Sequence, residues 1–333
     1  MSDLAVQHGL PEAPTRGERP SEHQLELYRS ELTGFCYRML GSPFEADDAV
    51  QDTMIRAWRA LDRFDSRSSL RSWMYRIATN VCLDMLNGRK RRALPMDMSP
   101  SAPPVLESLG VALPESAWIE PMPDGRVTPE DPADVAVSRE SIRLAFVAAL
   151  QQLPPRQRAV LILREVLRWK AEEVAELLES TVASVNSALQ RARATMAAHD
   201  GGALEPMDDA QQELLSRYVD AFQRYDIDGL VALLHEDATL SMPPYPLWLR
   251  GPADIAAWLV GPGLECRGSH WIQVQANGSA AFGQYRPSGP DGAHEPWALH
   301  VVEVSGDRIS RMITFLDTDR LFPLFGLPLR PVG

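Results

Sequence analysis

The chain has 333 residues, with 33 Lys and Arg against 45 Asp and Glu, which gives a formal net charge of -12. This length allows two or three domains, and without a run of about eighteen apolar residues the sequence predicts no membrane span. Cys36, Cys82 and Cys266 match no metal-ligand spacing, which favours free thiols in a reducing cytoplasm. Residues 1–20 lack the order of a secretion signal, so we expect a disordered tail there.

Residues 21–93 have a helical pattern. A capping signal at Ser42, Pro43 and Glu45 predicts the start of one helix. The buried stripe of that helix is expected to contain Val50, Met54, Ala57, Trp58 and Leu61. A second helix follows a polar turn and ends in four consecutive basic residues at 89–92. A basic run in so acidic a chain calls for a local explanation.

Residues 94–137 have many prolines and no hydrophobic period, and residues 94–139 hold two basic and eight acidic side chains. This composition predicts an acidic, Pro-rich linker that is not part of a core. Within it, Trp118 and Ile119 are interpreted either as a docking element or as part of a partly collapsed loop.

Residues 138–200 return to a helical pattern. A short helix near 171–178, a break at 179–181 and a helix over 182–196 have helix-turn-helix spacing. We expect Val182, Val185, Leu189 and Ala192 to point inward. Spacing alone is weak evidence for DNA binding, because many packed helix pairs share it.

Residues 207–328 begin with two helical stretches, at about 208–224 and 227–234, and a helix over 252–260 follows. Three strand-like runs come next, with a hairpin turn at Gly306 and Asp307. Helices followed by an antiparallel sheet predict an α+β domain, so the fold class is multidomain, with two all-α domains and an α+β domain.

The two helical segments resemble bacterial RNA polymerase sigma factors of the extracytoplasmic-function (ECF) class. The first domain, region two, is matched by "EADDAVQDTMIRAW" at 45–58 and "SLRSWMYRIATN" at 69–80. The second, region four, is matched by "LPPRQRAVLILREVLRWKAEEVAELL" at 153–178 and "TVASVNSALQRAR" at 181–193. The last domain is similar to the SnoaL-like cone that some of these factors carry, through "LLSRYVDAFQRYDIDGLVALLHEDATLSMPP" and "DTDRLFPLFGLP".

This resemblance implies a non-enzymatic factor that docks on core RNA polymerase, recognises two promoter elements and opens the duplex. The residues expected near the polymerase are Asp48, Gln51, Asp52 and Arg56, together with Trp58. For Trp58, burial in the domain's own core is the favoured interpretation, because it lies on the apolar stripe.

The loop at 64–69 and one face of the second helix fall where the family captures the minus-ten element. The bases of a separated DNA strand can stack on protein side chains and form hydrogen bonds through their edges. The expected DNA contacts are Arg71, Tyr75, Arg76, Asn80 and Asp84, followed by Arg89, Lys90, Arg91 and Arg92, which would neutralise phosphates. A solvated surface is the alternative for the arginines.

The recognition helix of region four is expected to read the minus-thirty-five element as duplex DNA through Ser184, Asn186, Ser187, Gln190, Arg191 and Arg193. Relatives often carry basic residues where this chain has Asn186 and Ala188. We therefore expect weak or partner-assisted binding to this element.

By resemblance, the linker enters the polymerase cleft toward the RNA exit channel, although a solvated tether fits its composition equally well. We expect the C-terminal domain to be a regulatory module without turnover that contacts regions two and four through the apolar segments 241–251 and 321–331. An unidentified small molecule in its pocket stays open as a partner. Pocket residues for acid or base chemistry, if the cone were catalytic, would be His235, Asp237, His270, His300 and Asp317.

Two alternatives are a SnoaL-like cyclase or isomerase tethered to DNA and a helix-turn-helix regulator whose ligand binds the cone. A tethered enzyme has no need of an acidic polymerase-docking helix. A repressor would act without core polymerase. No metal, cofactor or catalytic residue is predicted.

Overall fold

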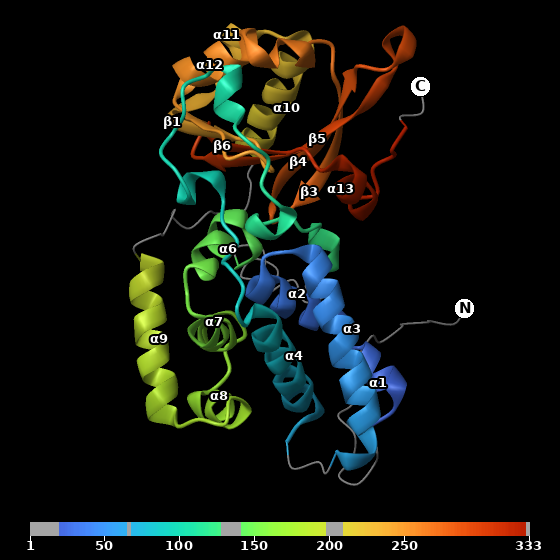
Figure 1. Ribbon diagram of the computed structural model, residues 1–333, viewed down its shortest axis with the longest axis vertical. Coiled ribbons are helices and arrows are strands. Elements are labelled where there is room, and N and C mark those ends of the chain that lie inside the picture. Colours follow the sequence, from blue (N-terminus) through green and yellow to red (C-terminus); the bar gives the residue numbers. More distant parts are fainter. Residues whose placement is uncertain (1–19, 65–67, 128–140, 198–208, 331–333) are drawn as a thin grey trace, which may run out of the picture.

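The computed structural model describes residues 20–64, 68–127, 141–197 and 209–330. Two groups of helices lie beneath a sheet that is covered by further helices (Figure 1). In these ranges no helix is both long and apolar enough to cross a lipid bilayer. Residues 1–19 of the predicted tail and residues 65–67 of the predicted minus-ten loop lie outside them.

The first group of helices packs around a core that includes Phe35, Met74 and Tyr75. Its elements are α1 (Glu22–Glu26), α2 (Arg29–Leu40), α3 (Pro43–Ala60) and α4 (Leu70–Leu86). Helix α3 begins as predicted, since the Ser42 hydroxyl accepts a hydrogen bond from the Glu45 N–H and Pro43 is in the first turn.

The second group contains the predicted helix-turn-helix. Its elements are α6 (Leu144–Gln151), α7 (Pro155–Leu161), a π-helical segment (Ile162–Val166), α8 (Ala171–Leu177) and α9 (Val182–Ala197). Val185, Leu189 and Ala192 are buried as expected, and Val182 is half-buried. Helices α7 and α8 contact α4, so the two groups pack directly against each other.

The C-terminal domain is a six-stranded sheet with helices packed on it, the α+β fold that the sequence predicts (Figure 1). Its elements are α10 (Asp209–Arg224), α11 (Ile227–Val231), β1 (Leu234–Ser241), β2 (Trp248–Arg250), α12 (Pro252–Val260), β3 (His270–Ala276), β4 (Ser279–Pro287), β5 (His294–Ser305), β6 (Arg308–Phe315) and α13 (Thr318–Leu324). The strand order is β2-β1-β6-β5-β4-β3.

The sequence suggested a wholly antiparallel sheet, but the sheet is mixed. Strand β1 pairs with β6 in parallel, whereas the other pairs are antiparallel. A helix and four strands separate β1 from β6 along the chain, and so long a connection lets β1 enter the sheet in the same direction as β6.

The expectation that residues 94–137 stay outside any core is wrong for the described part, 94–127. Leu94, Trp118, Ile119, Met122 and Val127 are buried there. This segment runs along the C-terminal domain and returns to its junction with the helices (Figure 1). Prolines exclude a long helix but not packing, and the apolar side chains find their partners in other domains, where no local pattern reveals them.

Candidate polymerase and promoter interface

Helix α3 presents a polar face opposite its buried one. Asp48 and Gln51 are exposed, and Asp52 pairs with Arg56 one turn later at 2.8 Å. Arg56 also lies 3.5 Å from Asp84 of α4. The four residues predicted to bind polymerase therefore share one accessible surface, which spans α3 and reaches α4.

The prediction that Trp58 is buried is wrong. Its side chain is 58% exposed, and its indole N–H donates to Glu22 of α1 at 2.6 Å. Val50, Met54 and Ala57 fill the stripe without it. A Trp at the edge of an apolar stripe can lie on either side of the boundary, and here it extends the α3 polar face with a large apolar surface.

The face of α4 predicted to hold the minus-ten strand is only partly free. Arg71 forms a bidentate pair with Glu31, and its guanidinium lies over the ring of Trp169 of the second group. Arg76 is 3.7 Å from Glu176 of α8. Asn80 and Asp84 are exposed. Arg71 and Arg76, two of the predicted DNA contacts, thus touch the second group of helices, which is the predicted region four.

Tyr75 cannot contact DNA in this arrangement. It is 0% exposed and packs edge-on against Phe35 and Trp169 at 5.2 and 5.1 Å. Burial raises the pKa of its phenol well above the ordinary range. The helical spacing of Tyr75 fits the inner face equally well, which is why the sequence placed it wrongly.

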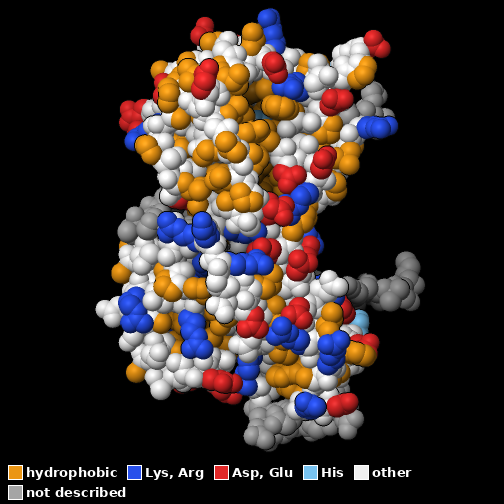
Figure 2. Space-filling view, viewed as in Figure 1, with side chains coloured by type: hydrophobic (Ala, Val, Ile, Leu, Met, Phe, Trp, Pro, Cys, Tyr) orange, Lys and Arg blue, Asp and Glu red, His pale blue; other side chains and the backbone are white. Residues whose placement is uncertain are grey.

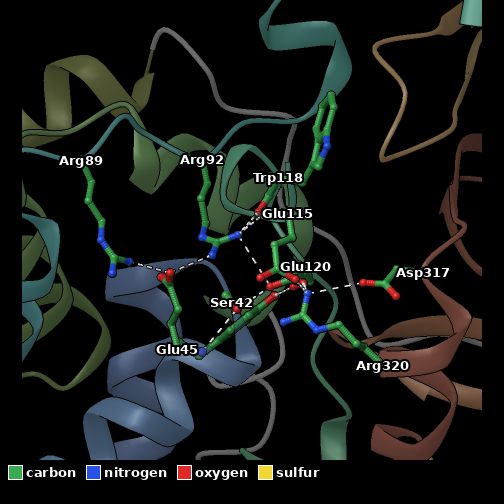
Figure 3. Close-up of polar contacts among 10 residues, drawn as sticks. Ser42, Glu45, Arg89, Arg92, Glu115, Trp118, Glu120, Asp317 and Arg320 are labelled. Atoms are coloured by element: carbon green, nitrogen blue, oxygen red, sulfur yellow. Dashed lines mark hydrogen bonds and ion pairs between the residues drawn. The ribbon is translucent and has the colours of Figure 1, made fainter. Parts of the chain in front are cut away.

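The four basic residues after α4 divide into different environments, and Figure 3 shows those of Arg89 and Arg92. Arg89 pairs with Glu45 at 2.6 Å, and Arg91 donates to Gln152 of the second group. Lys90 is exposed. Arg92 is only 7% exposed, so in this arrangement it cannot contact a phosphate.

Arg92 instead holds a junction between region two, the linker and the C-terminal domain (Figure 3). It pairs with Glu45 at 3.0 Å and Glu120 at 3.6 Å, and it donates to the carbonyl oxygens of Glu115 and Trp118. A buried guanidinium needs such partners, and Glu45 together with the polar groups of the linker supplies them.

Glu120 is the linker's contribution to this junction. The Ser42 hydroxyl donates to its carboxylate, and Arg320 of α13 lies 3.2 Å from it. Burial raises the pKa of Glu120 to about 7, although Ser42 and Arg92 oppose that shift. Arg320 also pairs with Glu115 and with Asp317. Glu115, Glu120 and Asp317 form a carboxylate cluster that Arg320 already contacts.

A second contact joins the C-terminal domain to the helices at the β3–β4 turn. The Asn277 amide donates to the Tyr37 hydroxyl at 2.7 Å and to the Ile142 carbonyl, and its oxygen accepts from the Met122 N–H at 2.8 Å. Asn277 has a φ of 55°, which Asn tolerates better than most residues. One side chain therefore touches region two, the linker and the start of region four.

The recognition helix α9 presents the predicted reading face. Ser184, Asn186, Ser187, Gln190, Arg191 and Arg193 are all exposed. Arg193 pairs with Glu165 at 2.6 Å. Figure 2 shows further Lys and Arg side chains along the boundary between the helical part and the C-terminal domain.

Of the five residues predicted to line a pocket in the cone, only Asp317 lines the cavity between the linker and the C-terminal domain. His300 is buried between Gln284 and Thr314, at 2.6 and 3.1 Å, and lies on the Trp271 ring. Burial lowers the pKa of His300 to about 3, so it stays neutral. His235 and His270 are half-buried and exposed, respectively, and Asp237 pairs with Arg250. These residues form no shared acid–base site.

Sequence reasoning missed Glu120, Asn277 and Arg320. The Asn277-Gly278 pair was a readable hairpin signal, but nothing in the sequence indicated what its side chain meets. For Glu120 and Arg320, composition alone predicted charged side chains in contact with solvent.

Two packed groups of helices, the second with a helix-turn-helix, and a C-terminal sheet domain form the arrangement expected of a promoter-recognition factor of RNA polymerase. Family models agree: "Sigma-70 region 2" matches residues 25–92, "Sigma-70, region 4" matches 143–196 and "SnoaL-like domain" matches 215–312. The ECF RNA polymerase sigma factor SigG of Mycobacterium tuberculosis is 45% identical over 98% of this chain and 89% of its own length. SigW of Bacillus subtilis is 29% identical over 51% of this chain and 82% of its own.

The crystal structure of the Mycobacterium tuberculosis ECF sigma factor SigJ has the same fold, with a TM-score of 0.61 and 21% identity, and the match covers 93% of this chain and all of that one. The chain belongs to the ECF RNA polymerase sigma factors. It is therefore a transcription initiation factor and not an enzyme, and neither a DNA-tethered cyclase nor a ligand-responsive repressor is favoured.

Proposed function

We propose that this sigma factor works in the cytoplasm, docks on core polymerase through the exposed side of α3, captures the minus-ten strand with α4 and reads the minus-thirty-five element with α9. We further propose that its C-terminal domain holds the free protein in a closed arrangement that polymerase must open. The contact of α4 with α8 supports the closed arrangement, and the contacts of Asn277 and Arg320 support the role of the C-terminal domain in it.

Docking on polymerase is supported by the α3 face. Asp48 and Gln51 are exposed, and the Asp52–Arg56 pair is exposed enough to exchange partners. Exposed pairs of this kind contribute little to stability, about 0.3–0.5 kcal/mol, so the fold does not require them. Trp58 adds the kind of aromatic anchor that dominates interface energetics.

Promoter reading is supported by the chemistry of the two exposed faces. Asn80 both donates and accepts, as contact with an unpaired base requires. On α9, Asn186 and Gln190 suit adenine edges, and Arg191 suits guanine or phosphate. Because Arg193 pairs with Glu165, its charge is already partly used, and this fits weak binding of the duplex element.

The spacing of the two promoter elements argues that the arrangement is closed. Elements about 25 base pairs apart are separated by about 85 Å of B-form duplex, at about 3.4 Å per base pair. Here Arg76 of α4 touches Glu176 of α8, and Arg158 of α7 donates to the Met39 carbonyl of α2. Both faces cannot engage one promoter until region two and region four separate.

The C-terminal domain is placed to oppose that separation. Asn277 bonds to Tyr37 of region two and to Ile142, two residues before α6, and Arg320 bonds to the linker through Glu115 and Glu120. The predicted contact segment 241–251 bonds to the linker, where the Trp248 indole donates to the Ser99 carbonyl at 2.8 Å. In 321–331, by contrast, Phe322 packs against Tyr285 of the domain's own sheet. We therefore assign regulation to the β3–β4 turn, α13 and 241–251.

Promoter-specific transcription tests this proposal. Core polymerase reconstituted with the full chain is expected to initiate from specific sites of a genomic library, and Asn277→Gly should raise the yield at limiting sigma factor. The double variant Asp48→Lys, Asp52→Lys should abolish this promoter-specific transcription without unfolding the protein. Transcription that does not depend on the added chain, or that survives both lysine substitutions, would contradict the docking proposal.

A further inference from the structure

A cavity of about 950 Å³ lies between the linker and the C-terminal domain. This volume is at the upper end of the range for pockets that hold drug-sized ligands. Its rim reaches the surface, because Leu106 of the linker is 61% exposed and Leu264 of the C-terminal domain is 50% exposed. Figure 2 shows hydrophobic side chains gathered over the middle of this domain.

The two walls of the cavity come from different parts of the chain. Leu109, Leu113 and Trp118 form the linker wall, and Met242, Trp258 and Phe315 are among the residues of the other. Backbone bonds hold the walls together, for example from the Leu113 N–H to the Pro244 carbonyl at 2.9 Å. A molecule in the cavity would therefore touch both walls and add to the contact between them.

The polar groups of the cavity are mostly acidic. Four carboxylates line it, those of Glu115, Glu120, Glu265 and Asp317, against one lining cation, Arg286. Arg286 is already occupied, since it pairs with Glu265 at 2.8 Å and lies 3.7 Å from the centre of the Trp297 ring.

Near the other three carboxylates, Arg320 is the counter-charge from outside the lining. Their oxygens lie within 4.8 Å of one another, and Arg320 contacts all three. Arg92 adds a contact to Glu120 but is shared with Glu45. Because burial raises the pKa of Glu120 to about 7, it carries only part of a negative charge near neutral pH. Together with Glu115 and Asp317 it still exceeds the single charge of Arg320, so an anionic ligand would be repelled and a cation attracted. The indole N–H of Trp118, a buried lining residue, has no hydrogen-bond partner in the described part of the chain.

We propose that this cavity binds a small molecule with an apolar, ring-containing body and a protonated amine, the amine lying at the carboxylates of Glu115, Glu120 and Asp317. Such a ligand favours the state in which linker and C-terminal domain are joined, and so opposes release of the linker to polymerase. The binding site stands independently of the sigma function, whereas the effect on polymerase rests on the proposed closed arrangement. At ten times its Kd, a ligand specific for the closed state lowers the apparent affinity for polymerase about tenfold.

A matched series of probes tests the site in the full-length protein: 1-naphthylmethylamine, 1-naphthylmethanol and 1-naphthoic acid, titrated by calorimetry and by ligand-observed NMR. We expect the amine to bind at least about tenfold more tightly than the acid, and more tightly than the alcohol. Asp317→Asn should reduce the preference for the amine over the alcohol while the alcohol still binds. An acid or alcohol that binds as well as the amine, or no binding of any probe, would overturn the proposal.

Two variants fill the cavity from opposite walls, Leu109→Trp and Leu264→Trp, and each should reduce amine binding at least about tenfold. Val111→Trp is the matched control, because Val111 is an exposed linker residue outside the lining. Leu264 is exposed enough to accept a larger side chain, so at least one filled variant should fold, as circular dichroism would verify. Amine binding that is unchanged in a folded filled variant would refute the site. If the amine binds normally but polymerase affinity stays constant, the regulatory link fails and the site stands.

Discussion

Removing the Asn277 side chain should loosen the C-terminal domain from the helices. Asn277→Gly keeps the turn, because glycine adopts a φ of 55° without strain. It deletes three hydrogen bonds, to Tyr37, Ile142 and Met122. At about 1 kcal/mol for each bond, the closed arrangement loses about 3 kcal/mol. That is about a 100-fold change in the equilibrium between closed and open forms.

Hydrogen exchange at the Met122 amide, which donates to Asn277, should accelerate by up to that factor. The affinity for core polymerase should rise as the open form becomes more populated. Asp291→Gly is the matched control, since Asp291 is an exposed turn residue of the same domain with a φ of 58°. Equal exchange rates and equal polymerase affinities in the two variants would refute the assignment of Asn277 to an interdomain lock.

Four further outcomes are expected. Arg92→Ala should lower the free energy of unfolding by about 3 kcal/mol, because it leaves Glu120 buried without that partner. Substitution of the exposed Arg89 by Ala should change the free energy of unfolding by less than about 1 kcal/mol. Equal losses of the two variants in urea unfolding would contradict the buried junction. The pKa of Glu120 is raised to about 7, so ionisation is disfavoured in the folded state and wild-type stability should fall, relative to Glu120→Gln, as pH rises from 5 to 8; a difference that is constant with pH would exclude this. Trp58→Ala should weaken polymerase binding at least about tenfold and leave thermal stability nearly unchanged, and a large loss of stability would return Trp58 to the core. Arg191→Ala should weaken binding of minus-thirty-five duplexes and lower the salt slope by about one, whereas an unchanged slope would exclude a phosphate contact.

Local signals gave the elements of this fold, and contacts between distant segments decided the rest. The cap at Ser42 and the turn before α9 are short-range features, and the structure has both where the sequence predicts them. Tyr75 and Trp58 both lie near a boundary between apolar and polar faces, where periodicity does not decide, and each lies on the side opposite to the predicted one.

The basic run shows the same limit for charge. Arg89, Arg91 and Arg92 are adjacent in the sequence, but their partners are Glu45, Gln152 and Glu120, which lie in three other segments. Composition correctly indicated that these charges needed an explanation. It could not show that the partners of Arg92 lie in this chain and not in DNA. Those partners belong to the linker, whose packing depends on side chains more than twenty residues away in the sequence.

The separation of region two from region four tests the central claim most directly. Spin labels at Asn87→Cys on the C-terminal end of α4 and Ala194→Cys on α9, with Cys266→Ser and the buried Cys36 and Cys82 retained, would report it by double electron–electron resonance. We predict one short distance in the free protein and a distance longer by tens of ångströms on core polymerase with promoter DNA. A distance that is the same in both states would contradict the account.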